Sequence, residues 1–361
     1  MFLKNKESCY YHFVSNPNKK ILSFDLDSTL IEPKSGAKFP KDASDWKYIY
    51  PNVKYELLRL SKIYNLIIFT NQKGLDDQFK RLQFNTKLND IYLDLGFEIS
   101  TFIATDDDIY RKPHTGMYKL FLELSKFKDE DIDDLIYCGD AAGRKYSDGT
   151  KDFSISDYYF AFNIDAIFKL PEDIFKQPKK DAKIVDLYDT IDLKKYITKD
   201  SLPDSIIKGE KEREVILLVG LPACGKSTIS KKYYSHYKNI NMDTIKDKKK
   251  MMAIYKDYIS NGNPIIVDNT NTKKDTRKEF IEIAKSNKYN IKIIYQDIPF
   301  EICNHLNNYR VETSDSKKIS IITYRTMLKY FEVPTEDEGK IIKLNKIYDF
   351  KDDNINNFKF S

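Results

Sequence analysis

Short apolar runs alternate with longer segments of helical periodicity along most of this chain. In the first half the apolar runs predict strands at residues 21–24, 66–70, 102–104 and 135–138, with helices at 53–63 and 117–124 between them. In the second half they predict strands at 215–219, 264–267 and 291–295, and the alternating stretch 341–347 predicts a last strand. Strands that alternate with helices are typical of a parallel sheet covered by helices, so we predict an α/β fold.

A chain of 361 residues is too long for one ordinary hydrophobic core and indicates two domains. The polar, Pro- and Lys-bearing stretch 177–214 is the best candidate for a boundary. We therefore predict a first domain over 1–180, a partly ordered linker over 181–213, and a second domain over 214–361. Each domain is expected to hold a mainly parallel sheet flanked by helices.

Composition indicates a globular protein but does not identify its ligand. The net charge is +5, from 60 basic and 55 acidic side chains, which is compatible with a polyanionic ligand without requiring one. The cysteines Cys9, Cys138, Cys224 and Cys303 lack metal-binding spacing and read as reduced thiols of an intracellular protein. No apolar run approaches 18 residues and no secretory signal is visible, so we expect a soluble protein without a membrane segment.

Chemically reactive side chains follow each predicted strand of the first half, and the carboxyl ends of parallel strands meet at one edge of a sheet. These side chains are Asp25 and Asp27 after the first strand, Thr70 and Asn71 after the second, Arg111 and Lys112 after the third, and Asp140 after the fourth. A lone Asp-x-Asp is a weak signal, but the whole set in this order is a strong one.

This set contains what an aspartyl phosphatase needs. Asp25 can attack phosphorus and form a phosphoaspartate, and Asp27 can protonate the leaving oxygen and then activate water. Thr70 and Lys112 can hold the transferring phosphoryl group. Asp140, Asp25 and the main chain near Asp27 can bind Mg²⁺, a hard cation that prefers oxygen ligands. The arrangement resembles the haloacid-dehalogenase-type phosphatases.

A second phosphate motif, Gly-x-x-x-x-Gly-Lys-Ser-Thr, follows the predicted strand at 215–219 and precedes a helical pattern. Its glycines allow backbone N–H groups to surround phosphate oxygens, as in a P-loop that binds ATP. Lys226 is expected to reach the β- and γ-phosphates, and Ser227 to bind Mg²⁺. The expected nucleotide-binding residues are Gly220, Cys224, Gly225, Lys226, Ser227 and Thr228.

Three downstream residues are candidates for the rest of a phosphotransferase site, each with a purely structural alternative. Asp243 could take the proton of an attacking hydroxyl or could cap a helix. Asp268 ends a predicted strand and could order the phosphate site or simply form a turn. Arg310 could close over the phosphates as a lid cation or could lie on a solvated helix face.

Together these residues resemble the bifunctional polynucleotide kinase/3′-phosphatases over roughly residues 21–347. The more specific matches are Lys-Ser-Gly at 34–36, Gly-Asp-Ala-Ala-Gly-Arg at 139–144, and Phe-Glu-Val-Pro-Thr at 331–335. Two departures stand out: Ser28 occupies a position that is usually Gly, and Met242 one that is usually Arg, where Lys246 could substitute.

The resemblance implies a haloacid-dehalogenase-like 3′-phosphatase followed by an ATP-dependent, P-loop 5′-hydroxyl kinase. It supports Asp243 as base and Arg310 as lid, and it implies that Asn71, Arg111, Arg144, Lys246 and Asp268 bind substrate. The expected substrates are DNA or RNA strand ends, made ready for a ligase that acts downstream. A monomer is expected, in the nucleus or at a site of DNA repair. Because only about 20 residues precede the first predicted strand, we do not expect recruitment through the phosphopeptide-binding domain of animal relatives.

End repair cannot depend on sequence, so the nucleic acid should be held by its backbone. The candidates are Lys246, Lys248, Lys249, Lys250, Lys273, Lys274 and Arg277, which could equally form solvated helix faces. Two other functions stay open: the same domains acting on small nucleotides or sugar phosphates, and a nucleic-acid-binding scaffold with degenerate sites. The scaffold is disfavoured because every acidic and basic position that the chemistry needs is filled.

Overall fold

The computed structural model describes residues 3–186, 192–207, 213–314 and 316–360. The chain divides into two compact units. Unit 1 combines Met1–Asp189 with Val311–Lys317 and Asn357–Ser361, and unit 2 combines Thr190–Arg310 with Lys318–Asn356. In the stretch predicted as a linker, β11 (Ala182–Ile184), α6 (Leu193–Tyr196) and α7 (Asp204–Ile207) are formed, and 187–191 and 208–212 lie outside the described residues.

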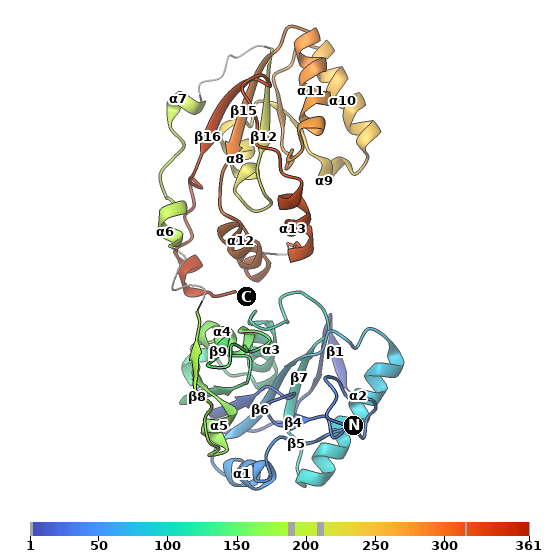
Figure 1. Cartoon of the computed structure of the whole chain (residues 1–361), viewed down its shortest axis with the longest axis vertical. Coiled ribbons are helices and arrows are strands. Elements are labelled where there is room, and N and C mark those ends of the chain that lie inside the picture. Colours follow the sequence, from blue (N-terminus) through green and yellow to red (C-terminus); the bar gives the residue numbers. More distant parts are fainter. Residues whose placement is uncertain (1–2, 187–191, 208–212, 315, 361) are drawn as a thin grey trace. The chain divides into compact units, whose positions relative to one another are not determined.

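A sheet of seven strands in the order β1-β2-β7-β6-β3-β8-β10 forms the centre of unit 1 (Figure 1). Its parallel part consists of β3 (Lys20–Phe24), β6 (Asn65–Asn71), β7 (Ser100–Ala104), β8 (Asp134–Cys138) and β10 (Ile167–Lys169). A hairpin of β1 (Lys4–Lys6) and β2 (Cys9–His12), which the apolar pattern did not predict, adds antiparallel to β7.

Helices cover both faces of this sheet because each central strand is apolar on both sides. Leu22 and Phe24 of β3 pack in one buried cluster with α1 (Val53–Leu60) and α2 (Gln78–Leu95). Ile21 faces the other way, in a cluster with α3 (Gly116–Ser125) and α4 (Ser156–Asn163). Helix α2 begins where the Asp77 side chain accepts a hydrogen bond from the Lys80 N–H, and it ends at Gly96, whose φ of 82° is left-handed.

Smaller elements surround the carboxyl ends of these strands. They are the pair β4 (Ile31–Glu32) and β5 (Lys47–Tyr48), strand β9 (Arg144–Tyr146), which pairs antiparallel with β11, and helix α5 (Pro171–Ile174). The last residues of the chain also belong to unit 1: the Lys359 N–H donates to Asn163 Oδ1 at 2.7 Å, and Asn163 Nδ2 donates to the Lys359 carbonyl at 2.8 Å.

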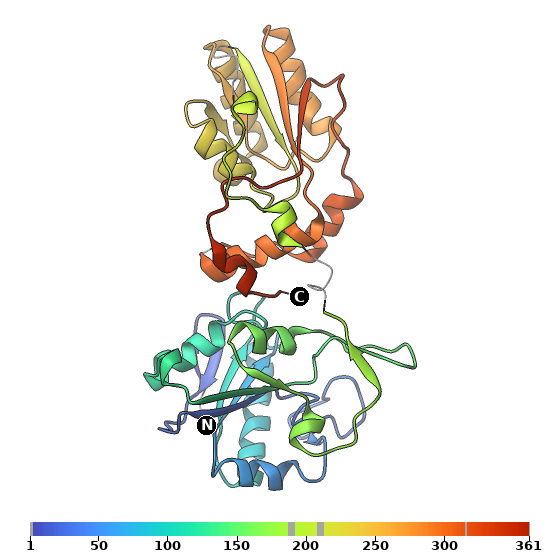
Figure 2. The same cartoon turned by 90° about the vertical axis from the view of Figure 1, so that its left-hand side faces the viewer.

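Unit 2 is built on five strands, all parallel, in the order β13-β14-β12-β15-β16. They are β12 (Glu214–Val219), β13 (Lys238–Ile240), β14 (Ile265–Val267), β15 (Asn290–Gln296) and β16 (Lys340–Leu344). Helices α10 (Lys248–Ser260) and α11 (Lys274–Ser286) cover one face, and α8 (Lys226–Tyr233) covers the other (Figures 1 and 2). Helices α9 (Met242–Ile245), α12 (Phe300–Thr313) and α13 (Ile321–Lys329) complete the connections.

The predicted fold class is confirmed: the chain is α/β, and the sheets of both units are rich in parallel strands. All four cysteines are buried free thiols. Within the described ranges, no helix combines the length and the apolar character needed to cross a bilayer.

Candidate active sites

The first site lies where the strand order of unit 1 reverses, because β6 and β8 flank β3 on opposite sides. Asp25 directly follows β3, and its Oδ1 accepts a hydrogen bond from Lys112 Nζ at 2.8 Å. The same ammonium donates to Asp157 Oδ1 at 2.7 Å, and Tyr137 OH donates to that oxygen at 2.8 Å. Lys112 is therefore fixed beside Asp25 by a buried network.

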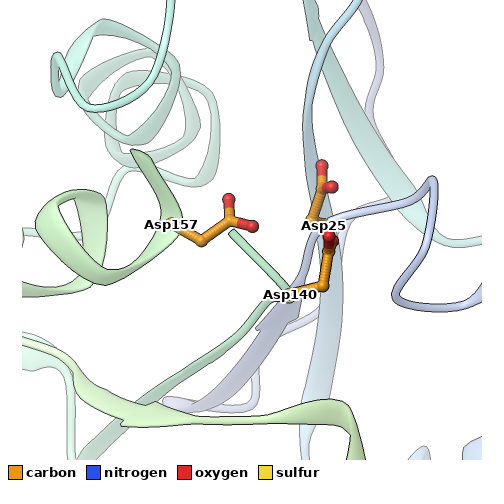
Figure 3. A group of neighbouring side chains, drawn as sticks. All are labelled: Asp25, Asp140 and Asp157. Atoms are coloured by element: carbon orange, nitrogen blue, oxygen red, sulfur yellow. The ribbon is translucent and has the colours of Figure 1, made fainter. Parts of the chain in front are cut away.

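Three carboxylates converge around this lysine. Ligand oxygens of Asp25, Asp140 and Asp157 lie within 4.8 Å of one another, with Asp25 and Asp140 side by side and Asp157 opposite them on α4 (Figure 3). Thr29 Oγ1 donates to Asp140 Oδ1 at 3.0 Å. Burial raises the pKa of Asp25 to about 7, although the Lys112 charge opposes this, and burial raises the pKa of Asp140 well above its usual range.

A divalent cation fits this donor set. Three carboxylates, one buried and two partly buried, face one ammonium, so two negative charges need compensation, and carboxylate oxygens are what a hard cation prefers. Both oxygens of Asp157 already accept hydrogen bonds, from Lys112, Tyr137 and the Ala141 N–H. Asp25 and Asp140 are therefore the better direct ligands, and Asp157 the better partner for Lys112.

The Asp27 carboxylate has its own supports. Gln72 Nε2 donates to Asp27 Oδ2 at 2.5 Å and also to Thr70 Oγ1 at 3.0 Å. Lys87 on α2, only 4% exposed, places its Nζ 3.5 Å from Asp27 Oδ1. Asp27 is thus contacted from two elements, and Gln72 links its side chain to Thr70, which was predicted to hold the phosphoryl group.

Two other predicted residues shape the loop that carries Lys112. Asn71 Oδ1 accepts from the Lys112 N–H at 2.9 Å, and Asn71 Nδ2 donates to the Lys112 carbonyl at 3.1 Å. Arg111 Nη1 is buried and has no hydrogen-bond partner within the described part of the chain. A substrate-binding role for Asn71 and Arg111 stays a prediction.

Arg144 is occupied by protein groups. Its guanidinium donates to Asp152 Oδ2 at 2.8 Å, to Glu172 Oε1 at 3.2 Å and to the Asp140 carbonyl at 3.1 Å. These contacts brace the loop that presents Asp140. The predicted role of Arg144 in binding substrate stays untested, and the contacts give it a positioning role.

The second site follows β12, again where the strand order reverses, since β14 and β15 flank β12. Gly220 and Gly225 have φ values of 151° and 91°, and Ala223 between them has a φ of 60°. An added Cβ at Gly220 would meet Cys224 Sγ and the Gln296 backbone. The backbone at Gly220 can pass this close to Cys224 and Gln296 only because Gly220 lacks a side chain. The loop leads into the N-terminus of α8, which begins at Lys226.

Lys226 lies folded along the loop. Its Nζ donates to the carbonyl oxygens of Gly220 at 3.1 Å and Leu221 at 2.5 Å and lies 3.5 Å from Cys224 Sγ. Ser227 Oγ donates to Asp268 Oδ1 at 3.2 Å. Burial raises the pKa of Asp268. A serine hydroxyl beside a carboxylate at the N-terminus of a helix is a donor set that suits a nucleotide-bound cation.

The acceptor side of the second site is more open. Asp243 is exposed on α9, and the cap of that helix is Asn241, which accepts from the Thr244 N–H. The alternative reading of Asp243 as a cap is therefore wrong. Met242 is tied by its N–H to Asn269 Oδ1 at 2.8 Å, and Lys246 ends the helix with a left-handed φ of 61°. Arg310 Nη2 donates to Asn307 Oδ1 at 3.0 Å.

Of the candidate contacts to a nucleic-acid backbone, Arg277 is corrected by the structure. Its side chain is fully buried and donates to both carboxylate oxygens of Glu338, at 2.6 and 2.9 Å. Arg277 is an interior residue of unit 2, paired with Glu338, and it cannot reach a phosphate. Lys248 pairs with Glu279 at 2.6 Å and Lys274 with Asp337 at 3.0 Å, and both pairs are surface contacts.

Sequence reasoning left some site residues without a role. Asp157, Tyr137, Gln72 and Lys87 all touch the groups of the first site. Tyr137 looked like an ordinary strand residue, and Lys87 lies among the many charged residues of a long helix. A signal existed for Gln72 and Asp157, which both belong to the stretches on which the family resemblance depended.

Comparison with known proteins gives matches to both halves of the chain. The family described as polynucleotide kinase 3 phosphatase matches residues 20–175, and the AAA domain family matches residues 215–334. A bifunctional polynucleotide phosphatase/kinase of Schizosaccharomyces pombe is 32% identical over 89% of this chain and 78% of its own length. A putative protein of the same description from Acanthamoeba polyphaga mimivirus is 29% identical over 89% of this chain and 82% of its own length. A polynucleotide 3′-phosphatase of Saccharomyces cerevisiae is 35% identical over 43% of this chain and 87% of its own length.

Proposed function

The chain belongs to the family of bifunctional polynucleotide phosphatase/kinases, and we propose which residues of its two units carry each half of that activity. The first unit is a polynucleotide 3′-phosphatase and the second a polynucleotide 5′-kinase, so that together they heal strand ends. The substrates are 3′-phosphate and 5′-hydroxyl ends of DNA, the phosphate donor is ATP, and both units use Mg²⁺.

In the first unit Asp25 is the nucleophile. Its free carboxylate oxygen bonds to phosphorus while the bond between phosphorus and the 3′-oxygen breaks, and Asp27 gives that oxygen its proton. Water then attacks the phosphoaspartate, Asp27 accepts the proton of that water, and inorganic phosphate leaves. Lys112, fixed by Asp157 and Tyr137, lies beside the charge that develops on the phosphoryl oxygens. Mg²⁺ at Asp25 and Asp140 would supply further neutralisation there.

In the second unit the loop from Gly220 to Ser227 holds the triphosphate. Lys226 exchanges its contacts with the loop carbonyls for the β- and γ-phosphates, and Ser227 with Asp268 would hold the cation. Asp243 accepts the proton of the 5′-hydroxyl as its oxygen bonds to the γ-phosphorus and ADP departs. The exposed position of Asp243 beside Asn269 leaves the space that an incoming strand needs.

The observation that carries the assignment is the network of Asp25, Lys112, Asp157 and Asp140 at the switch point of the first sheet. The test is a duplex with a nick that bears a 3′-phosphate and a 5′-hydroxyl, incubated with γ-labelled ATP, with both ends of the nick followed. Asp25→Asn should abolish phosphate release and leave labelling intact, and Lys226→Ala should do the reverse. Loss of both activities in either folded variant would contradict two independent sites.

A further inference from the structure

Tyr330 lies on the surface of unit 2 between two cations. Its side chain is 48% exposed, although an aromatic ring of this size is usually more buried. Lys273 Nζ lies 5.1 Å from the centroid of the ring and Lys329 Nζ lies 5.2 Å from it. An accessible ring with flanking ammonium groups is the combination by which proteins bind single-stranded nucleic acid without reading its sequence.

The backbone beside this ring is fixed by hydrogen bonds from the buried side chain of Arg277. Arg277 Nη1 donates to the carbonyl oxygens of Asn271 and Glu332, each at 2.9 Å. The Glu332 N–H donates to the Thr272 carbonyl at 2.8 Å. Because the buried guanidinium joins the two segments, the stretch that follows Tyr330 cannot move independently of residues 271–272.

Residues 271–272 come directly after residues of the candidate kinase site in the sequence. Asp268 directly follows β14, and Asn269 accepts from the N–H of Met242, the residue before the proposed base Asp243. Tyr330 directly follows α13, and two residues later the Glu332 N–H is bonded to Thr272, on the segment that leads from Asp268 and Asn269. This position suits a contact to the strand whose 5′-hydroxyl reacts, rather than to the nucleotide donor.

The surrounding charge favours the same ligand. Lys273, Arg325 and Lys329 form no ion pair with any residue that the structure describes, and all three are exposed. Arg325 and Lys329 are four residues apart on α13, so they share one face of that helix. Uncompensated cations around an exposed ring are complementary to a polyanion that carries aromatic bases.

We propose that Tyr330 stacks on a nucleobase close to the 5′-end of the acceptor strand while Lys273 and Lys329 contact the phosphates on either side. The ligand is a single-stranded polynucleotide end of any sequence, since every base offers a π-face. This inference rests on the proposed kinase activity of unit 2 and adds a binding site to it.

The test compares Tyr330→Ala and Tyr330→Phe in the full chain, with a 5′-hydroxyl oligonucleotide as acceptor. Stacking is worth about 1–3 kcal/mol per base, so Tyr330→Ala should raise the KM for the oligonucleotide by at least about fivefold. Tyr330→Phe should keep the wild-type KM because the ring, and not the hydroxyl, makes the contact. The kcat at saturation, the KM for ATP and the 3′-phosphatase rate should not change in either variant.

A second pair of the same kind provides the matched control. Lys238 Nζ lies 5.8 Å from the ring of Tyr258, but Lys238 begins β13, so this pair is at the amino edge of the sheet, away from the P-loop. Tyr258→Ala should leave the KM for the oligonucleotide unchanged. Thermal unfolding of each variant identifies any general loss of structure.

Oligonucleotides with 2-aminopurine at successive positions from the 5′-end locate the stacked base. The fluorescence change on binding should be largest at one position, should persist in Tyr330→Phe and should disappear in Tyr330→Ala. An unchanged KM and an unchanged fluorescence response in Tyr330→Ala would overturn the inference while leaving the kinase assignment intact. Failure of the wild-type chain to phosphorylate any 5′-hydroxyl end would instead overturn the proposed function.

Discussion

Removing one partner of the buried ion pair between Arg277 and Glu338 should strongly destabilise unit 2. The guanidinium is fully buried, the carboxylate is 4% exposed, and their bonds are 2.6 and 2.9 Å long. Glu338→Gln keeps the size of the side chain but leaves an uncompensated charge in the interior. Breaking a buried pair in this way costs about 3–5 kcal/mol.

Two probes separate the units in this experiment. The only tryptophan, Trp46, packs against the core of unit 1, so its fluorescence reports the unfolding of that unit by urea. Hydrogen exchange of peptides from β12 and β15 reports unit 2. For an m-value of about 2 kcal/mol/M, the loss should lower the urea midpoint of unit 2 by about 1.5–2.5 M and leave the Trp46 transition in place.

The control is the neighbouring surface pair of Lys274 and Asp337, whose side chains are 46% and 67% exposed. Asp337→Asn removes a charge at the same end of the same segment, yet it should not shift the midpoint measurably because water screens the pair. If Glu338→Gln shifts the midpoint no more than Asp337→Asn does, the argument from burial is wrong.

Three further predictions concern the first site. Burial raises the pKa of Asp25 to about 7, so the folded state holds a proton that the unfolded state has lost above about pH 4. The stability of the chelated protein should therefore fall as the pH rises towards 7, and Mg²⁺ should raise the Tm more at pH 8 than at pH 5. Lys87→Met should slow the cleavage of a 3′-phosphorylated oligonucleotide about tenfold but slow that of p-nitrophenyl phosphate less. Misplacing Asp27 impairs its role as the base for both esters, but its role as the acid matters only for the ester whose leaving oxygen needs a proton. Gly139→Ala should abolish phosphate release while 5′-labelling persists, because the added Cβ would overlap the Asp157 carboxylate.

Each of these predictions has a result that contradicts it. An equal effect of Mg²⁺ on the Tm at both pH values would show that the cation does not bind ionised carboxylates of this site. Equal slowing of the two phosphate esters by Lys87→Met would mean that the lysine has a general structural role, and recovery in Lys87→Arg would support placement of Asp27 by a cation. Normal phosphate release by Gly139→Ala would show that Asp157 is not needed where the structure places it.

The apolar pattern predicted the central strands well because buried parallel strands are apolar on both faces, as the runs that became β3 and β12 show. It did not predict the hairpin of β1 and β2, because β1 is polar and both strands are short, and β2 is placed by its pairing with β7. The motifs predicted that Asp25 and Asp140 lie at the same edge of the sheet. Each residue follows a parallel strand, and the carboxyl ends of parallel strands meet at one edge.

The pattern was less informative for charged side chains on helices. Arg277 and Lys87 both lie on helices with many charged residues, where a solvated position is the usual expectation. Arg277 is instead fully buried because Glu338, 61 residues later, comes back to neutralise it. Such long-range pairing leaves no periodic trace in the sequence, so the sequence could not separate this arginine from the exposed lysines beside it.

The grouping of residues 311–317 and 357–361 with the first unit affects how the two activities can be separated. A single cut between the units would remove from the phosphatase fragment the C-terminal segment whose Lys359 backbone is bonded to Asn163. The kinase fragment would keep that segment without its binding partner. Point substitutions within the full chain, rather than truncation, are therefore the cleaner way to study either half alone, and affinity tags are better attached away from the carboxyl terminus.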